Sequence, residues 1–362
     1  MAFSFDDMRS NKPLRNLVLL GALTVATVVA SVIAVSVQER GVKVQFVPEQ
    51  MYPGLETKLD QVGKIVYTLP RGMRDPEKIT LTRNAQNQWV VAERQNYPAD
   101  QDLVRKTLIG VSELQLYQPR TARKEWQREL GLLEPENLGK AVRVEFFDKD
   151  SQKVVSLLAG KVPEQTVDAR GQGMIYVRRD GEAQSYLARG RLPLVQTAQD
   201  WLDQKFLDVT REDIRRVTLW DGTDHPVYLS RASVDQNDFT IENIPAGRST
   251  RGAPIVNGAA TAVAGMNFDD AIPVTSFEFP DSSPKAVIEL FDGTKLTLTI
   301  TGGGGALWAK IAAEGAAGTE AGKRAEVINA RVASWVYKLT KDAGGQLTQS
   351  MDLLTHEGGL PE

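Results

Sequence analysis

The sequence contains no cysteine and only two histidines. Without cysteine the chain forms no disulfide, offers no thiolate to a metal ion and has no cysteine nucleophile. The histidines, His225 and His356, stand far apart in the sequence, so a histidine-rich metal centre is not available. We therefore predict no metal site, and nothing in the composition points to a cofactor, so none is assigned.

An excess of charge of one sign is also missing. The 43 Lys and Arg residues nearly balance the 46 Asp and Glu residues, for a formal net charge of −3. A balanced chain has no long-range basic field, so we expect no nucleic-acid partner. With 42% hydrophobic and 25% charged residues, the 362-residue chain has the composition of folded, water-soluble domains and is long enough for two of them plus an appendage.

Long uncharged hydrophobic runs are rare, and the one that matters extends from Asn16 to Val37 without a charged residue. As a helix rising about 1.5 Å per residue, it is about 33 Å long, enough to cross the hydrocarbon core of a bilayer. The run is longer than a signal-peptide core of about 7–15 residues, and no A-x-A site ends it, although a cleaved signal peptide remains the alternative. We interpret residues 16–37 as a transmembrane signal-anchor.

Basic residues flank this segment asymmetrically. Three precede it and two follow it: Arg9, Lys12 and Arg15, then Arg40 and Lys43. The small excess before the segment favours a cytoplasmic N-terminus. This predicts a cytoplasmic tail at 1–15 and a linker at 38–62, with the bulk of the chain in the periplasm of a bacterium, attached to the inner membrane by a single pass.

Small side chains recur along one face of the predicted anchor. The set is Ala22, Ala26, Ala30 and Ala34, with Thr27 and Ser31 beside them. In lipid, small residues at four-residue spacing let two helices approach closely, which favours their association. This stripe predicts a helix–helix interface with a permease helix or with a second copy. The alternative is that alanine is simply common in membrane helices.

Two stretches of the remaining chain are nearly alike. They are "KAVRVEFFDKDSQKVVSLL", from Lys140, and "KAVIELFDGTKLTLTI", from Lys285. Each alternates polar and apolar residues, reaches Phe-Asp, turns and alternates again, which predicts an antiparallel hairpin. Strands, a proline loop and a helix precede each hairpin; Asp100 is the expected N-cap of the first helix. The common order indicates a duplicated unit.

The predicted fold class is therefore α+β. A single N-terminal transmembrane helix is followed by two duplicated units of antiparallel sheet backed by helices, at 63–210 and 213–345, and by a flexible tail at 346–362. A closing helix is expected at the end of each unit, with Trp201 and Trp335 as equivalent core anchors. The alternative is that two unrelated α+β domains share common hairpin patterns.

Three other motifs have only structural interpretations. "TGGGG" (301–305) lacks the Lys-Ser/Thr of a phosphate loop and predicts a hairpin connection. "WDGTDHP" (220–226) lacks the ligand series of a calcium loop and is typical of a turn. Basic residues gather in "RTARKEWQREL" (120–130), which we interpret as a solvated, salt-paired surface in preference to a contact with anionic headgroups.

The order of several motifs resembles the bacterial domain-of-unknown-function family 4340. They are "QWVV", "NYPAD", "ELQLYQPR", "GLLEP", "VRVEFFDKD", "LLAGKV", "IYVRR" and "FLDVTREDIRRVTL". The resemblance covers most of residues 60–345 and is best in the first repeat. Members are envelope proteins often grouped with ABC-2-type permeases and gliding-motility-like auxiliary proteins. The resemblance implies an accessory, non-ATPase subunit. It supplies no catalytic residues, so none is assigned, and we expect that the protein is not an enzyme.

The expected function is a membrane-anchored, extracytoplasmic scaffold subunit of an ABC-type envelope transport complex. Its expected partners are a transmembrane permease, other envelope subunits or a second copy. Two alternatives remain open. A periplasmic module that binds a lipid or a glycan in the groove between the repeats would require an apolar or aromatic cleft there. An envelope hydrolase would require strongly perturbed carboxylates in a cleft.

Overall fold

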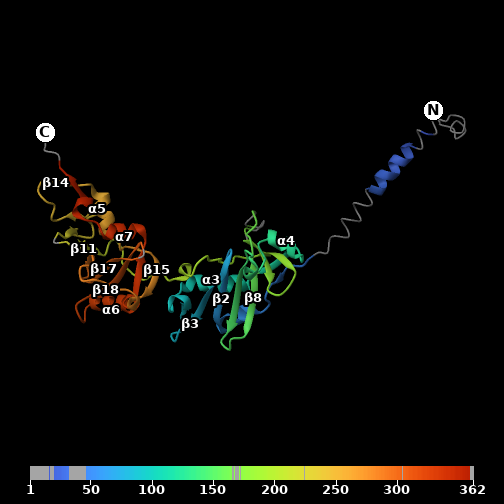
Figure 1. Ribbon diagram of the computed structural model, residues 1–362, viewed down its shortest axis with the longest axis horizontal. Coiled ribbons are helices and arrows are strands. Elements are labelled where there is room, and N and C mark those ends of the chain that lie inside the picture. The colour runs from blue at the N-terminus through green and yellow to red at the C-terminus, as the bar shows by residue number, and fades with distance from the viewer. Residues whose placement is uncertain are drawn as a thin grey trace.

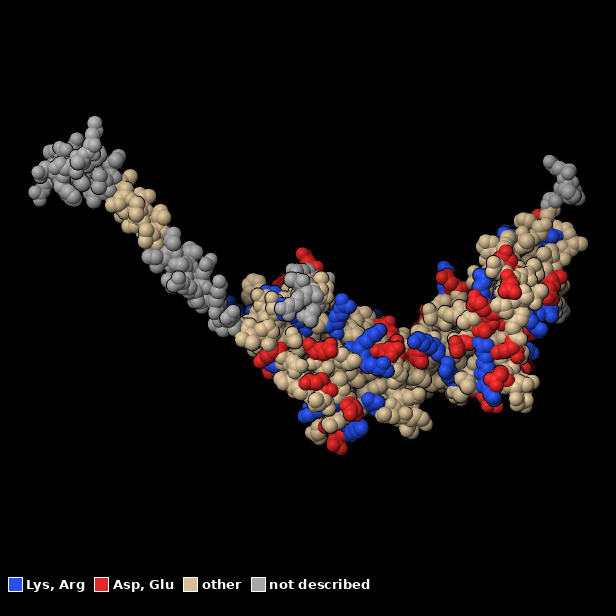
Figure 2. Space-filling view, turned by 180° about the vertical axis from the view of Figure 1, so that it is seen from behind, with Lys and Arg blue, Asp and Glu red and all other residues tan. Residues whose placement is uncertain are grey.

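The computed structural model describes residues 16, 20–31, 46–164, 167, 171, 173–223, 225–303 and 305–358. Within these residues the chain forms two bodies, each built on a large antiparallel sheet with helices against it (Figure 1). The α+β class predicted from the sequence is confirmed. Figure 2 shows Lys and Arg side chains interspersed with Asp and Glu over both bodies, as the balanced composition implies.

The first body comprises residues 46–202 and contains a ten-stranded sheet. In spatial order its strands are β1 (Glu49–Gln50), β6 (Gln115–Pro119), β10 (Ser185–Arg189), β9 (Met174–Arg179), β8 (Lys153–Ala159), β7 (Val142–Asp148), β2 (Val62–Arg71), β3 (Arg74–Arg83), β4 (Trp89–Val91) and β5 (Tyr97–Pro98). Two α-helices accompany it, α3 (Gln101–Ser112) and α4 (Lys124–Glu129), together with the short 3-10 helices η1 (Leu55–Gln61), η2 (Ala92–Arg94), η3 (Pro135–Asn137) and η4 (Gln199–Trp201).

The second body comprises residues 209–358 and contains an eight-stranded sheet. In spatial order its strands are β13 (Thr240–Ile241), β12 (Val227–Ser230), β11 (Ile214–Trp220), β16 (Lys285–Leu290), β17 (Lys295–Gly303), β18 (Ala306–Glu314), β19 (Trp335–Leu339) and β15 (Phe268–Pro273). Its helices are α5 (Ala253–Ala260), α6 (Glu320–Val332), α7 (Lys341–Leu347), α8 (Met351–Leu354) and the 3-10 helix η5 (Val274–Ser276). A small separate sheet pairs β14 (Arg248–Thr250) with β20 (Thr355–Glu357).

Eight strands follow the same order in both sheets. The order β4-β3-β2-β7-β8-β9-β10-β6 in the first body corresponds to β13-β12-β11-β16-β17-β18-β19-β15 in the second. The hairpins β7–β8 and β16–β17 therefore occupy the same place, which confirms the prediction made from their sequences. Helices α3 and α5 also correspond, because each leads from the strands at one side of its sheet to a strand near or at the opposite edge.

Local sequence signals account for these elements. The Asp100 side chain caps α3 by accepting from the backbone N–H groups of Asp102 at 2.9 Å and Leu103 at 3.0 Å, as predicted. In the turn between β16 and β17, Asp292 Oδ1 accepts from the N–H of Thr294 at 2.7 Å, and Gly293 has φ +92°. A residue without a side chain adopts that conformation without strain, so Asp-Gly terminates one strand and starts the next.

The expected equivalence of Trp201 and Trp335 is wrong. Trp201 is fully buried in η4, after the last strand of the first sheet, whereas Trp335 is partly buried and begins β19. The reason is the position of α6, which comes before the strand β19, while a short turn joins the equivalent strands β9 and β10. The first body has no closing α-helix at 194–202; the only helical turn described there is η4.

Two segments expected to be a linker and a tail belong in part to the folded bodies. Within 38–62, strand β1 and η1 are part of the first body, and Met51 and Leu55 are buried. Within 346–362, Leu347 and Leu354 are buried and β20 pairs with β14, so this segment is not a flexible tail over its described residues. Burial of a few apolar side chains is enough to attach such a segment to a folded body. The low apolar content of the segment as a whole therefore does not predict this attachment.

Part of the predicted anchor is described. Residues 20–31 are helical, and the hydroxyls of Thr24 and Ser31 donate to carbonyl oxygens of Leu20 at 2.7 Å and Thr27 at 2.8 Å. Ala34 and the predicted cytoplasmic tail at 1–15 lie outside the described residues. Among the described residues, no helix is both long and apolar enough to cross a membrane.

Candidate functional site

The linker between the two bodies (residues 203–208) runs along an edge of both sheets. The N–H of Asp203 donates to the carbonyl of Pro98 in β5 at 3.0 Å, next to a bridge between Ala99 and Leu202. At the other sheet, the N–H of Phe268 in β15 donates to Gln204 Oε1 at 3.0 Å. These bonds satisfy backbone groups at sheet edges that would otherwise attract another strand. The linker therefore helps to hold the two bodies together at this place, which we call the joint.

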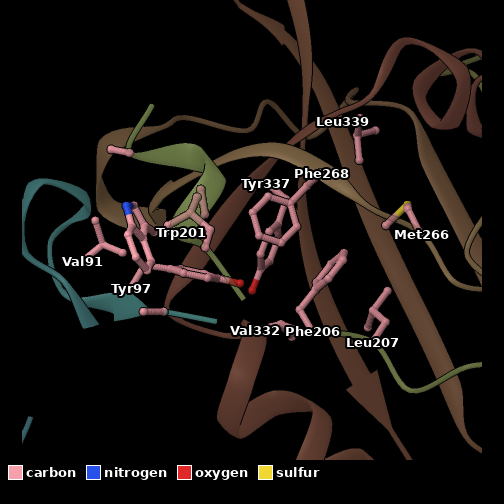
Figure 3. Close-up of a cluster of buried hydrophobic side chains, with 14 of the residues drawn as sticks. Val91, Tyr97, Trp201, Phe206, Leu207, Met266, Phe268, Val332, Tyr337 and Leu339 are labelled. Carbon is pink, nitrogen blue, oxygen red and sulfur yellow. The ribbon is translucent and has the colours of Figure 1, made fainter. Parts of the chain in front are cut away.

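An aromatic cluster fills the joint between the bodies (Figure 3). Tyr97 comes from the first body, Phe206 from the linker, and Phe268, Trp335 and Tyr337 from the second body. Ring centroids lie 4.9 Å apart for Tyr97 and Trp335, 5.0 Å for Phe206 and Phe268, and 4.4 Å for Phe206 and Tyr337. Such pairs stabilise an interface beyond the area they bury.

The two tyrosine hydroxyls of this cluster face each other (Figure 3). Burial raises the pKa of Tyr97 far above its ordinary value, and the nearby Tyr337 and Asp203 raise it further. Burial likewise raises the pKa of Tyr337. Both rings therefore stay neutral throughout the physiological range, which suits a packed joint and gives neither hydroxyl the character of a base.

A polar contact joins the same two bodies. Asp270 in β15 accepts from Arg94 Nε at 2.8 Å through one carboxylate oxygen and from Gln199 Nε2 at 3.0 Å through the other. The side chains of Arg94 and Asp270 are only 22% and 19% exposed. Because one carboxylate of the second body binds two donors of the first, the contact constrains their relative orientation.

Beside this joint lies a groove of about 890 Å³, which we call the inter-body groove. Its lining comes from the first body (Gln88, Tyr97, Pro98, Gln101), the linker (Asp203, Gln204, Lys205, Phe206, Leu207, Asp208) and the second body (Gly265, Met266, Asn267, Ala330, Arg331, Trp335). The lining combines aromatic rings with amides and charges of both signs. Tyr97 and Phe206 are buried, so Trp335, which is partly buried, is the aromatic side chain that presents surface to the groove.

The polar groups of the groove divide into committed and available ones. The Gln101 amide is committed, because its Nε2 donates to the carbonyls of Trp89 and Ala99. Lys205 and Arg331 are exposed, and no ion pair or side-chain hydrogen bond involves either cation in the described part of the chain. A ligand in the groove would thus meet a partly exposed indole and two cations free to contact it.

An ion-pair network fixes the far end of the linker. Arg324 of α6 donates to the carbonyl of Asp208 at 2.6 Å and pairs with Asp213 at 3.0 Å and Asp292 at 2.9 Å. Burial alone would raise the pKa of Asp213 and of Asp292, but hydrogen bonds, including those from Arg324, outweigh it and lower both pKa values. Carboxylates held ionised by an arginine in this way are typical of a structural ion pair.

The other motifs singled out in the sequence lie away from the groove. The prediction that "TGGGG" is a connection is wrong for most of the motif, because Thr301, Gly302 and Gly303 end strand β17 and pair with β18, while Gly304 lies outside the described residues. In "WDGTDHP", Asp221 Oδ1 accepts from the N–H and hydroxyl of Thr223, so its carboxylate is used by the turn, while Asp224 lies outside the described residues. No group of three His, Asp or Glu side chains that could hold a metal ion was found where the structure is described.

Comparison with known protein families gives a match. The model of the family described as "Domain of unknown function (DUF4340)" matches residues 89–282, just over half of the chain. The matched range begins at β4, includes the linker and the part of the joint that precedes β16, and leaves out Trp335 and Tyr337. No curated protein and no solved structure matches the chain.

Proposed function

Given that the chain belongs to the DUF4340 family, we propose that it is a membrane-anchored, extracytoplasmic, non-catalytic accessory subunit of an ABC-type envelope transport complex in a bacterium. Residues 16–37 are its single-pass anchor, with the N-terminus in the cytoplasm. The units at 63–210 and 213–345 are products of a duplication. The shared order of eight strands and the corresponding hairpins support this origin.

The joint between the bodies is the observation that carries this proposal. Linker hydrogen bonds, an aromatic cluster and the Arg94–Asp270–Gln199 contact all act at one place. A subunit that holds other proteins in position requires a fixed geometry, and such a joint makes two bodies behave as one platform. In this role the body supplies recognition surface outside the membrane, and the anchor supplies a docking helix within it.

The anchor provides the test of this function. Tagged full-length protein is crosslinked in native membranes and purified, and its partners are identified by mass spectrometry. We expect a transmembrane permease or a second copy of the chain. The double variant Ala26→Leu/Ala30→Leu should insert normally but recover less partner, because bulky side chains prevent close helix approach.

The matched control is Leu23→Ala/Val29→Ala, which changes the anchor outside the stripe of small residues. It should retain the partner. Equal losses in both double variants would show that the helix is only a tether. If no envelope transport component is crosslinked to the wild-type protein, the accessory-subunit proposal is wrong.

A second candidate function is binding of a glycan in the inter-body groove. The partly buried Trp335 beside amides and charges favours a polar ligand with a flat apolar face over an acyl chain, which needs a continuous apolar wall. Titration of the full-length protein with envelope glycan fragments tests it. Lys205→Ala should weaken binding, and Lys341→Ala, at an exposed lysine away from the groove, should not. Equal affinities of all three proteins would contradict this candidate.

A further inference from the structure

The basic segment 120–130 is not the salt-paired surface expected from the sequence. Its central part is α4, which Arg123 precedes as the N-cap residue. Arg123, Lys124 and Arg128 are exposed and form no ion pair within the described residues. Trp126 of the same helix is 59% exposed. The helix is nevertheless fixed, because the buried Gln127 donates through Nε2 to the carbonyl of Ala183 at 2.6 Å. An ordered helix thus presents cations and an indole to solvent.

Beside α4 lies a hollow of about 270 Å³, which we call the basic hollow. Its lining includes three cations, Arg128, Lys140 and Lys161, and one carboxylate, Glu129. None of these four side chains takes part in an ion pair or hydrogen bond where the chain is described. Its lining therefore carries a net positive charge, and no ion pair with another described residue neutralises it.

The acidic residues of the adjoining loop do not compensate for these cations. Glu134 pairs with Arg178, and Glu136 pairs with Arg143. For both carboxyl groups burial opposes ionisation, but hydrogen bonds from the paired arginine help to lower the pKa below its ordinary value. Both glutamates are thus already committed to arginines, so neither neutralises the cations of the basic hollow, which can attract an anionic ligand.

Exposed apolar side chains accompany the hollow. Leu138, which lines it, is 68% exposed, and Val162, next to Lys161, is 52% exposed. Trp126 lies three residues before Glu129 and so on the same side of α4 as this lining residue. Cations combined with tryptophan and leucine are the composition of protein surfaces that meet lipid headgroups.

The position of the hollow in the chain agrees with this composition. The chain enters the first body where the Phe46 ring lies 5.8 Å from that of Tyr186, and Tyr186 pairs with Pro119, only a few residues before α4. At about 3.5 Å per residue, the stretch from Val37 to Phe46 reaches at most about 32 Å. Helix α4 lies at the end of the first body remote from the second body (Figure 1).

We propose that the basic hollow binds the phosphate of an anionic phospholipid in the membrane that holds the anchor. Arg128, Lys140 and Lys161 contact the phosphate oxygens, while Trp126 and Leu138 enter the boundary between headgroups and acyl chains. This inference rests on the proposed anchor at 16–37. It gives the first body a defined orientation on the membrane, with the second body held away from it.

The test uses the full chain in lipid nanodiscs of phosphatidylcholine, with or without phosphatidylglycerol. Because the protein has no cysteine, Glu125→Cys gives a unique site on α4 for an environment-sensitive fluorophore. We expect a blue shift and quenching by spin-labelled lipid in discs that contain phosphatidylglycerol. In the Glu125→Cys protein, the triple change Arg128→Gln/Lys140→Gln/Lys161→Gln should raise the phosphatidylglycerol content needed for half of the effect. It should weaken the association of the hollow with the bilayer about 100-fold, at roughly fivefold per cation.

The control variant neutralises three exposed lysines outside the hollow, Lys106→Gln/Lys310→Gln/Lys341→Gln, and should respond as the parent does. Reversal of the signal by millimolar inorganic phosphate would overturn the proposal, because the hollow would then bind free phosphate. Insertion of the anchor is measured independently, by co-migration of the protein with phosphatidylcholine discs. A chain that inserts but shows no response to phosphatidylglycerol overturns the headgroup site alone, whereas failure to insert overturns the anchor and the headgroup site together.

Discussion

Removing the ring of Phe206 should open the joint between the two bodies. Phe206 belongs to the linker, is 3% exposed, and packs at 4.4 Å from the Tyr337 ring and 5.0 Å from the Phe268 ring. Truncation of a buried phenylalanine to alanine typically costs about 3–5 kcal/mol, because contacts are lost and a cavity remains. Since tenfold corresponds to about 1.4 kcal/mol, the opening equilibrium of the joint should rise by about two to nearly four orders of magnitude.

Amide hydrogen exchange of the full-length protein measures this change locally. The reporter is the N–H of Phe268, which is bonded to the Gln204 side chain of the linker. It should exchange at least 100-fold faster in Phe206→Ala under conditions where exchange follows the opening equilibrium. Phe146→Ala is the matched control, because Phe146 is fully buried in the sheet of the first body.

The control should accelerate exchange in β7 and β8 and leave the Phe268 amide nearly unchanged. The reasoning is refuted if Phe206→Ala accelerates the Phe268 amide less than tenfold, or if Phe146→Ala accelerates it as much. Either result would mean that the aromatic contacts do not hold the joint, and that the linker hydrogen bonds and the Asp270 contact suffice.

Two further predictions concern the second body. Arg324→Met should make the free energy of unfolding depend less on pH in acid. In the folded state the pKa values of Asp213 and Asp292 are lowered below 3.8. The stability that these carboxylates contribute is therefore present above that pH and is lost as the pH falls through their folded-state pKa values. The free energy of unfolding, measured in urea from pH 5 to pH 2, should fall more steeply for the wild type than for the variant. Parallel pH dependences of the two proteins would contradict this. Deletion of 347–362 should lower the melting temperature by several degrees, since it removes buried Leu354 and strand β20; an unchanged melting temperature would restore the interpretation of this segment as a tail.

Local signals were sufficient for the elements of the two sheets. The two hairpins were predictable because side chains alternate between sheet faces with period two and because Asp292-Gly293 specifies a tight turn. The start of α3 was predictable because Asp100 satisfies its free N–H groups. These interactions connect residues that are close in the chain, so the local sequence is enough to predict them.

Only the tertiary structure decided where segments distant in the sequence meet. The joint brings Tyr97 against Trp335, and the basic hollow collects Arg128, Lys140 and Lys161 while the nearby glutamates bind other arginines. In the sequence, the surface around α4 looked salt-paired because acidic and basic residues alternate along it. Ion pairing depends on distances of a few ångströms in space, and those distances are set by how the sheets and loops pack rather than by the spacing of charges along the chain.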